Sequence, residues 1–93
     1  MKLFLISQNI NNDYDTYSDA VVAAPTAKDA QMMHPSYDVS IWHDDKWWLV
    51  RADGSEFNAC NTWVNPKQVK VIYLGEAKIG TKKCVICSSF HAG

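Results

Sequence analysis

Two cysteines near the end of the chain have the spacing of a metal or redox motif. Cys84-Val85-Ile86-Cys87 is a CxxC sequence, and His91 follows it closely. Zinc and redox sites use this spacing where a turn or a helix N-terminus brings both sulfurs together. Here the run is strand-like, so positions i and i+3 point to opposite faces, and no second ligand pair accompanies it. We therefore predict buried structural cysteines, with a zinc-stabilised domain using Cys84, Cys87 and His91 as the alternative.

A second candidate is the polar stretch 11–16, NNDYDT, which has the alternating oxygen ligands of a calcium loop. Such loops need glycine at the sixth position and a bidentate glutamate at the twelfth, where this chain has Thr16 and Val22. Asparagine and aspartate also favour turns. We therefore predict a solvated loop between two strands and no calcium site.

Three histidines are candidate bases, namely His34, His43 and His91, with Asp44 or Asp45 as orienting partners. His34 falls at the end of a predicted helix, where a cation is favoured without any catalytic role. The chain contains no nucleophile elbow and no glycine-rich phosphate loop. Since no set of nucleophile, base and orienting residue can be assembled, we predict a protein that is not an enzyme and has no cofactor or bound metal.

The tryptophans are the most informative residues. Trp42, Trp47, Trp48 and Trp63 all belong to one short chain. Adjacent residues in a strand point opposite ways, so either Trp47 or Trp48 faces away from the core that the other joins. Exposed aromatic rings are frequent anchors of protein interfaces. The alternatives are that the segment folds back and buries both rings, or that they stack on single-stranded nucleic acid, which the neighbouring aspartates disfavour.

Length and composition indicate an ordinary folded domain. The chain has 93 residues, of which 47% are hydrophobic and 20% charged, enough for one core and one domain. Its formal net charge of −1 gives no general attraction to nucleic acid or to a membrane. Residues 1–45 carry two lysines against seven aspartates, a net −5, and residues 46–93 carry seven basic against three acidic residues, a net +4. A dipolar surface is therefore possible.

The cellular location is predicted from the N-terminal stretch and the cysteines. The hydrophobic run near the first residue is too short for a signal peptide or a membrane span. Cys60, Cys84 and Cys87 are an odd number, which we interpret as free thiols. We predict a cytosolic protein that does not bind membranes.

Alternating apolar residues predict the strands. The strongest signal is 68–74, QVKVIYL, which is β-branched or aromatic at most positions and is expected to be the central strand. Residues 2–8 and 19–24 are predicted as the first two strands, joined by the polar loop. Residues 84–90 form the last strand, expected to pair antiparallel with the central one.

One short helix is predicted between the second strand and the tryptophans. Thr26 is its expected N-cap, with Asp29 three residues later in a capping-box-like position, and Pro35 forces His34 out of helical geometry. A helix this short depends on packing against the sheet. Ala27, Ala30 and Met33 would form its buried stripe.

Residues 36–62 are a Trp-rich insertion, in which 39–42 and 46–51 could pair as a hairpin across His43-Asp44-Asp45, with Asp53-Gly54 as the next turn. The predicted order is β-β-α-insertion-β-β. We therefore expect one domain over residues 1–93 of the α+β class, a small antiparallel sheet of about four strands with the helix on one face.

An ordered set of segments runs through both ends of the chain: Tyr14-Asp15-Thr16-Tyr17, Ala20-Val21-Val22-Ala23-Ala24, His34-Pro35, Trp63-Val64-Asn65-Pro66 with Val69 and Val71, Leu74-Gly75-Glu76-Ala77 and Ser89-Phe90-His91-Ala92-Gly93. Together these segments resemble a family of small uncharacterised proteins carried by bacteriophages and prophages. The resemblance leaves residues 36–60 unmatched. The family has no assigned reaction or cofactor, so it implies no functional residues.

The resemblance implies a phage gene product in a bacterial cytoplasm. By analogy with small phage accessory proteins, we expect stoichiometric binding to a host protein complex, such as inhibition of a defence complex in the manner of an anti-CRISPR protein. The alternative is a small-molecule or nucleotide-binding domain with an aromatic pocket. A homodimer is credible because a small sheet leaves a face or an edge to cover. The predicted partner-binding residues are Asp13, Tyr14, Asp15, Tyr17, Trp42, Trp47 and Trp48.

Overall fold

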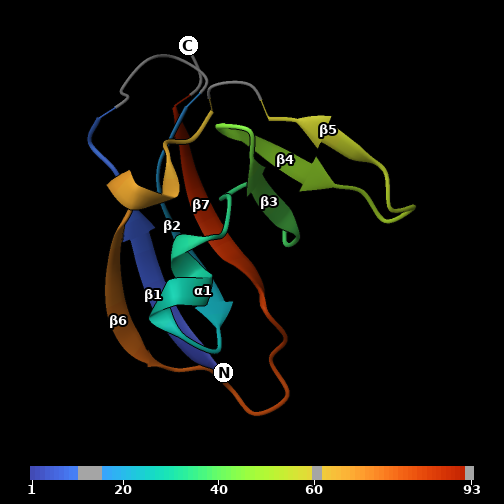
Figure 1. Ribbon diagram of the computed structural model, residues 1–93. Coiled ribbons are helices and arrows are strands. Elements are labelled where there is room, and N and C mark those ends of the chain that lie inside the picture. Colours follow the sequence, from blue (N-terminus) through green and yellow to red (C-terminus); the bar gives the residue numbers. More distant parts are fainter. Residues whose placement is uncertain (11–15, 60–61, 92–93) are drawn as a thin grey trace.

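The structure is a computed structural model that describes residues 1–10, 16–59 and 62–91. It contains two antiparallel sheets, one α-helix and one 3-10 helix (Figure 1). The elements in chain order are β1 (Lys2–Ser7), β2 (Thr16–Ala24), α1 (Ala27–Gln31), β3 (Ser40–His43), β4 (Lys46–Val50), β5 (Glu56–Asn58), η1 (Pro66–Gln68), β6 (Lys70–Glu76) and β7 (Cys84–His91). The α+β class predicted from the sequence is confirmed.

The larger sheet has the strand order β6-β1-β2-β7, so the hairpin of β1 and β2 lies at its centre. The prediction that the 68–74 strand is central is therefore wrong, because β6 lies at one edge. The predicted pairing of the last strand with it is also wrong, since β7 pairs with β2. Apolar character did not reveal this order: Ile72, Tyr73 and Leu74 of β6 are 40–56% exposed, whereas the less conspicuous β1 buries Phe4 and Ile6.

The smaller sheet has the order β3-β4-β5 and is built from the segment predicted as a Trp-rich insertion. The predicted hairpin is confirmed, with Trp42 opposite Trp47 and His43 opposite Lys46. Asp44 and Asp45 form its turn with φ of 52° and 58°. Two successive positive φ angles are the signature of the type I′ turn, whose twist matches that of the flanking strands.

The short helix α1 lies on one face of the larger sheet (Figure 1). Thr26 is its N-cap, as predicted: its hydroxyl oxygen accepts from the Asp29 backbone N–H at 3.2 Å and its hydroxyl donates to the Asp29 carboxylate at 2.9 Å. Ala30 and Met33 are buried as expected, but Ala27 is exposed. Ala27 is the first residue of the helix and belongs to an exposed stretch, residues 25–28.

One continuous hydrophobic cluster joins the inner face of the larger sheet to α1 and to the smaller sheet. Small side chains on β2 allow this close approach, because Ala20 and Ala24 are almost fully buried in the cluster. The cluster comprises Phe4, Ile6, Ala20, Val22, Ala24, Ala30, Met33, Trp47, Leu49, Ala59, Trp63, Val64 and Val69. The smaller sheet is thus attached to the core through one of its faces.

Candidate functional site

His34 is a buried structural residue that connects three parts of the fold. Its Nδ1 accepts a hydrogen bond from the Ser36 backbone N–H at 3.1 Å, so this nitrogen carries no proton. Its Nε2 lies 2.8 Å from the Thr62 hydroxyl oxygen, and that hydroxyl donates to the Ala59 carbonyl at 2.9 Å. The network therefore assigns the neutral tautomer with the proton on Nε2.

The prediction that His34 is a cation favoured by the helix C-terminus is wrong. The ring is fully buried, and burial lowers its pKa from 6.5 to about 4. The rings of Tyr17 and Trp47 pack edge-on against it, with centroids 5.8 and 5.7 Å away. A neutral imidazole enclosed by aromatic rings explains why the histidine belongs to the core and is not available as a surface base.

Trp47 and Trp48 point to opposite faces of the smaller sheet, as the sequence predicted. Trp47 is 1% exposed, and its indole N–H donates to the Val64 carbonyl at 2.7 Å. Trp42 lies opposite Trp47 on the same face, with ring centroids 5.4 Å apart. Trp47 is thus a core residue and cannot supply the partner contact for which it was proposed.

The other face of the smaller sheet carries an apolar strip that we name the hairpin patch: Val39, Ile41, Trp48 and Val50. Ile41 and Trp48 are opposite each other on β3 and β4, and Val39 and Val50 adjoin them through a backbone hydrogen bond. Val39 is 55% and Ile41 44% exposed, and Trp48 is half-buried. The Trp48 indole N–H donates to the His43 carbonyl at 3.1 Å, which orients the ring across the hairpin.

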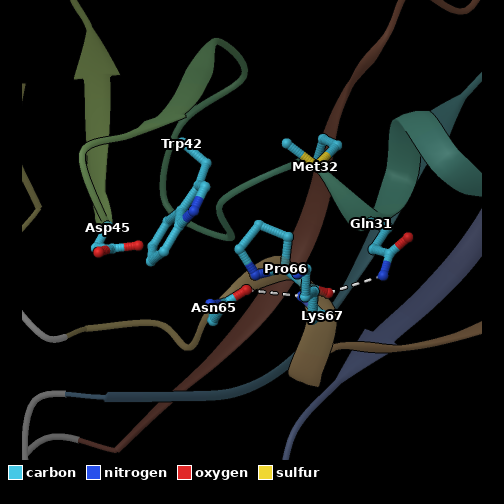
Figure 2. A pocket seen from close by; sticks show the side chains of 7 residues that line it. All are labelled: Gln31, Met32, Trp42, Asp45, Asn65, Pro66 and Lys67. Carbon is cyan, nitrogen blue, oxygen red and sulfur yellow. Dashed lines mark hydrogen bonds between the residues drawn. The ribbon is translucent and has the colours of Figure 1, made fainter.

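A pocket of about 320 Å³ opens beside the turn of the β3-β4 hairpin (Figure 2). Three elements meet there: the β3-β4 hairpin, the end of α1 and the start of η1. Its lining residues are Gln31, Met32, Trp42, Asp45, Asn65, Pro66 and Lys67. Figure 2 shows Asp45 beside the Trp42 ring on one side, and Gln31 with Met32 on the other. We name this site the Trp42 pocket.

Hydrogen bonds hold the floor of the Trp42 pocket. The Gln31 side-chain amide donates to the Pro66 carbonyl at 2.8 Å, and the Asn65 side-chain oxygen accepts from the Lys67 backbone N–H at 2.9 Å. The second of these bonds is the N-cap of η1. One aromatic, one acidic and one basic residue line the same opening, namely Trp42, Asp45 and Lys67. Such a set suits a flat ligand with polar groups at its edges.

The predicted acidic contact loop does not coincide with these surfaces as far as the structure describes it. Asp13, Tyr14 and Asp15, together with most of the calcium-like stretch, lie outside the described residues. The Tyr17 side chain is half-buried and packs against the core cluster. Its ring centroid lies 4.7 Å from that of Phe90. Tyr17 is therefore in part a packing residue.

The cysteine prediction is wrong for Cys87, which is exposed, while Cys84 is half-buried. Both are free thiols on the edge strand β7. The bulge at Ile86 brings them to the same face of the sheet, so the prediction of opposite faces is wrong. An edge strand covered on one face leaves alternate side chains in solvent, which the apolar sequence did not reveal. Within the ranges 1–10, 16–59 and 62–91, no three His, Cys, Asp or Glu residues are placed to hold a metal ion. The side chain of His91 and the whole of Cys60 lie outside the described part.

The remaining candidate base, His43, is on the surface. Its Nε2 lies 3.3 Å from a carboxylate oxygen of Asp44, and the two side chains are 70% and 77% exposed. An exposed pair of this kind has no enclosed cavity in which to hold a substrate. His43 is thus a surface residue, whereas His34 is buried.

The fold and its surfaces define a class of protein: a small α+β domain of two antiparallel sheets with an apolar hairpin face and one adjoining pocket. Comparison with models of known protein families, with curated proteins and with solved structures gives no match. The described part of the chain contains no helix long and apolar enough to cross a membrane.

Proposed function

We propose that this chain acts by stoichiometric binding to another protein, through the hairpin patch. The observation that carries the proposal is the placement of Trp48 and Ile41 on the face of the smaller sheet that the core does not use. An aromatic ring flanked by aliphatic side chains on a rigid hairpin is a favourable interface anchor, because little side-chain entropy is lost on binding.

The charges around the patch indicate the chemistry of the partner. Residues 38–58 carry five acidic residues against two basic ones, a net −3. A partner with a basic rim around an apolar contact would be complementary. Proteins that handle nucleic acid offer such surfaces. On the resemblance to phage proteins given above, we propose a host defence complex in the bacterial cytoplasm as the partner.

The test is an affinity pull-down of the tagged chain from lysate of a bacterial host, followed by reconstitution with the purified complex. Three proteins are compared: the natural chain, Trp48→Ala combined with Ile41→Asp, and the control Ile79→Ala. Ile79 is fully exposed in the β6-β7 connection, away from the patch. We expect a stoichiometric complex that the double variant loses and the control keeps. Equal recovery by all three proteins, or no complex with a folded chain, would contradict the proposal.

A second candidate function is recognition of a nucleotide in the Trp42 pocket. The observation that favours it is the arrangement of the Trp42 ring, the Lys67 ammonium group and the Asp45 carboxylate around one opening of about 320 Å³. A base could stack on the indole while the ammonium group contacts a phosphate.

Titration calorimetry with AMP, GMP and cyclic dinucleotides tests this second function. Trp42→Ala and Lys67→Gln should each weaken binding at least tenfold, whereas Lys28→Gln on the exposed helix surface should not. A chain that binds none of these at millimolar concentration, or binds them equally in every variant, does not use the pocket in this way. The result of this titration does not depend on the result of the pull-down, because the pull-down tests the hairpin patch and the titration tests the Trp42 pocket.

A further inference from the structure

The larger sheet has an outer face that neither α1 nor the smaller sheet covers. Residues that are register partners point to the same side of a sheet, so the pairings define three rows across β6, β1, β2 and β7. The rows, in that strand order, are Lys70, Ser7, Asp19 and Ser89; then Ile72, Leu5, Val21 and Cys87; then Gly75, Leu3, Ala23 and Cys84. We name these twelve positions the open sheet face; eleven of them are exposed or half-buried, and Ala23 is buried.

The open sheet face is apolar through its middle. The central row places Leu5 next to Ile72 on one side and Val21 on the other. Leu5 and Val21 are half-buried by their neighbours, and Ile72 is 40% exposed. The opposite face of the same strands carries the buried Phe4, Ile6 and Val22. The sheet is therefore apolar on both sides and covered on one, whereas an antiparallel sheet that faces water is usually polar on that side.

Two charges stand at one end of the open sheet face, and they have opposite signs. Lys70 on the edge strand β6 is opposite Ser7, and Ser7 is opposite Asp19 on β2. The other ten positions carry no charged side chain. Lys70 and Asp19 are thus two strands apart in the same row, on either side of the sheet's midline.

We propose that the open sheet face binds a second copy of this chain, about a two-fold axis parallel to the strands. Aligned sheets pack about 10 Å apart, with strand directions within about 30°. This axis places β6 over β7 of the second copy and β1 over its β2. Leu5 then meets the second copy's Val21, and Ile72 meets its Cys87. Lys70 lies over the second copy's Ser89, one strand from that copy's Asp19.

The charge arrangement favours a second copy over an unrelated partner. A two-fold axis generates each contact twice, so Lys70 of each copy lies one strand from the oppositely charged Asp19 of the other and is attracted to it. Any axis that laid Lys70 over Lys70 would create repulsion instead. The face is therefore self-complementary both in its apolar row and in its charged row.

The size of the open sheet face bears on how stable the proposed dimer can be. Four strands about 4.8 Å apart and six residues long at about 3.3 Å each give roughly 400 Å². A standard interface buries about 800 Å² on each partner. We therefore expect a weak dimer that dissociates on dilution.

Analytical ultracentrifugation from low to several hundred micromolar tests the proposal with four variants of the full chain. Asp19→Lys and Lys70→Asp each replace both symmetry-related attractions by repulsions, and we expect either change to weaken the dimer about tenfold. The combination of both changes exchanges the charges, and should restore the dissociation constant to within about twofold. Leu5→Lys places a charge in the apolar row and should abolish the dimer, while Ile79→Lys should leave it unchanged.

The natural chain should pass from 10.5 kDa toward twice that mass as its concentration rises. A chain that stays monomeric throughout would overturn the proposal. Single charge reversals without recovery in the double variant would overturn the two-fold arrangement. A dimer unaffected by Leu5→Lys would show that another surface, such as the edge of β6, is used. Circular dichroism of each variant checks folding, since Lys70 is exposed whereas Asp19 is half-buried.

Discussion

The Nε2 of His34 lies 2.8 Å from the Oγ1 of Thr62, and this contact joins the segment after α1 to the loop that precedes η1. Thr62 also accepts the Tyr17 backbone N–H through its carbonyl at 3.0 Å. One buried imidazole thus helps to hold the smaller sheet, the larger sheet and the connecting loop together. Protonation would cost it the hydrogen bond that Nδ1 accepts from the Ser36 backbone N–H.

We expect the free energy of unfolding to fall when the pH drops through the range in which His34 titrates. The folded pKa is about 4 and the ordinary value is 6.5. Between these values the unfolded chain binds a proton that the folded chain does not, so stability is full above pH 6.5 and decreases toward pH 4, by up to about 3 kcal/mol. Urea unfolding at several pH values measures this.

The matched variants for this experiment are His34→Gln and His43→Gln. The first should flatten the pH dependence between 6.5 and 4, even if it lowers stability overall. The second should leave it unchanged because His43 is exposed. An identical slope in the natural chain and in His34→Gln would assign the pH dependence to other groups.

Trp47→Phe should cost more stability than Trp63→Phe, although both indoles are buried. Trp47 donates to the Val64 carbonyl at 2.7 Å, while the Trp63 indole N–H finds no acceptor among the described residues. Losing this hydrogen bond leaves the buried Val64 carbonyl without a donor, which lowers the free energy of unfolding by about 1–3 kcal/mol. Removing an unpaired N–H avoids a desolvation cost and offsets part of the lost packing. Thermal unfolding of both variants measures the two losses of stability. A larger loss for Trp63→Phe than for Trp47→Phe would contradict the prediction.

Asp45→Gly should stabilise the fold by about 0.5–1 kcal/mol. Asp45 has φ of 58° at the second position of the β3-β4 turn, a conformation that glycine adopts without steric cost. Gly54→Ala in the β4-β5 turn is the opposite case, because Gly54 has φ of 87° and alanine would be strained there. Chemical denaturation should show a gain for the first and a loss of about 1 kcal/mol for the second. Equal shifts of one sign would contradict this assignment.

Thr26→Ala should lower stability by about 1 kcal/mol, because the Asp29 backbone N–H loses its acceptor at the start of α1. Thr26→Ser keeps the hydroxyl and should cost much less. Both variants can be compared by urea unfolding. If serine proved as costly as alanine, the methyl group and not the cap would be the important feature of this residue.

Local features of the fold were predictable because they depend on neighbouring residues. The Thr26 cap, the His43-Asp44-Asp45 turn and the opposite orientations of Trp47 and Trp48 follow from backbone geometry and from short-range hydrogen bonds. The strand order did not follow, because an apolar strand such as β6 fits the centre of a sheet and an edge equally well.

Little of the candidate site was predictable. The sequence indicated tryptophans at an interface, but only the fold placed Trp47 in the core and Trp48 on the outer face. The Trp42 pocket joins the end of α1 to the start of η1, two segments more than thirty positions apart in the chain. No periodicity in the sequence relates them.

The sequence by itself determined the class of fold, the helix cap, the turns and the alternation of side chains, since each arises from interactions over a few residues. Only the tertiary structure decided which strands are central, which tryptophan is buried and that His34 is neutral. These depend on which distant surfaces exclude water from one another, and that exclusion is a property of the packed chain as a whole.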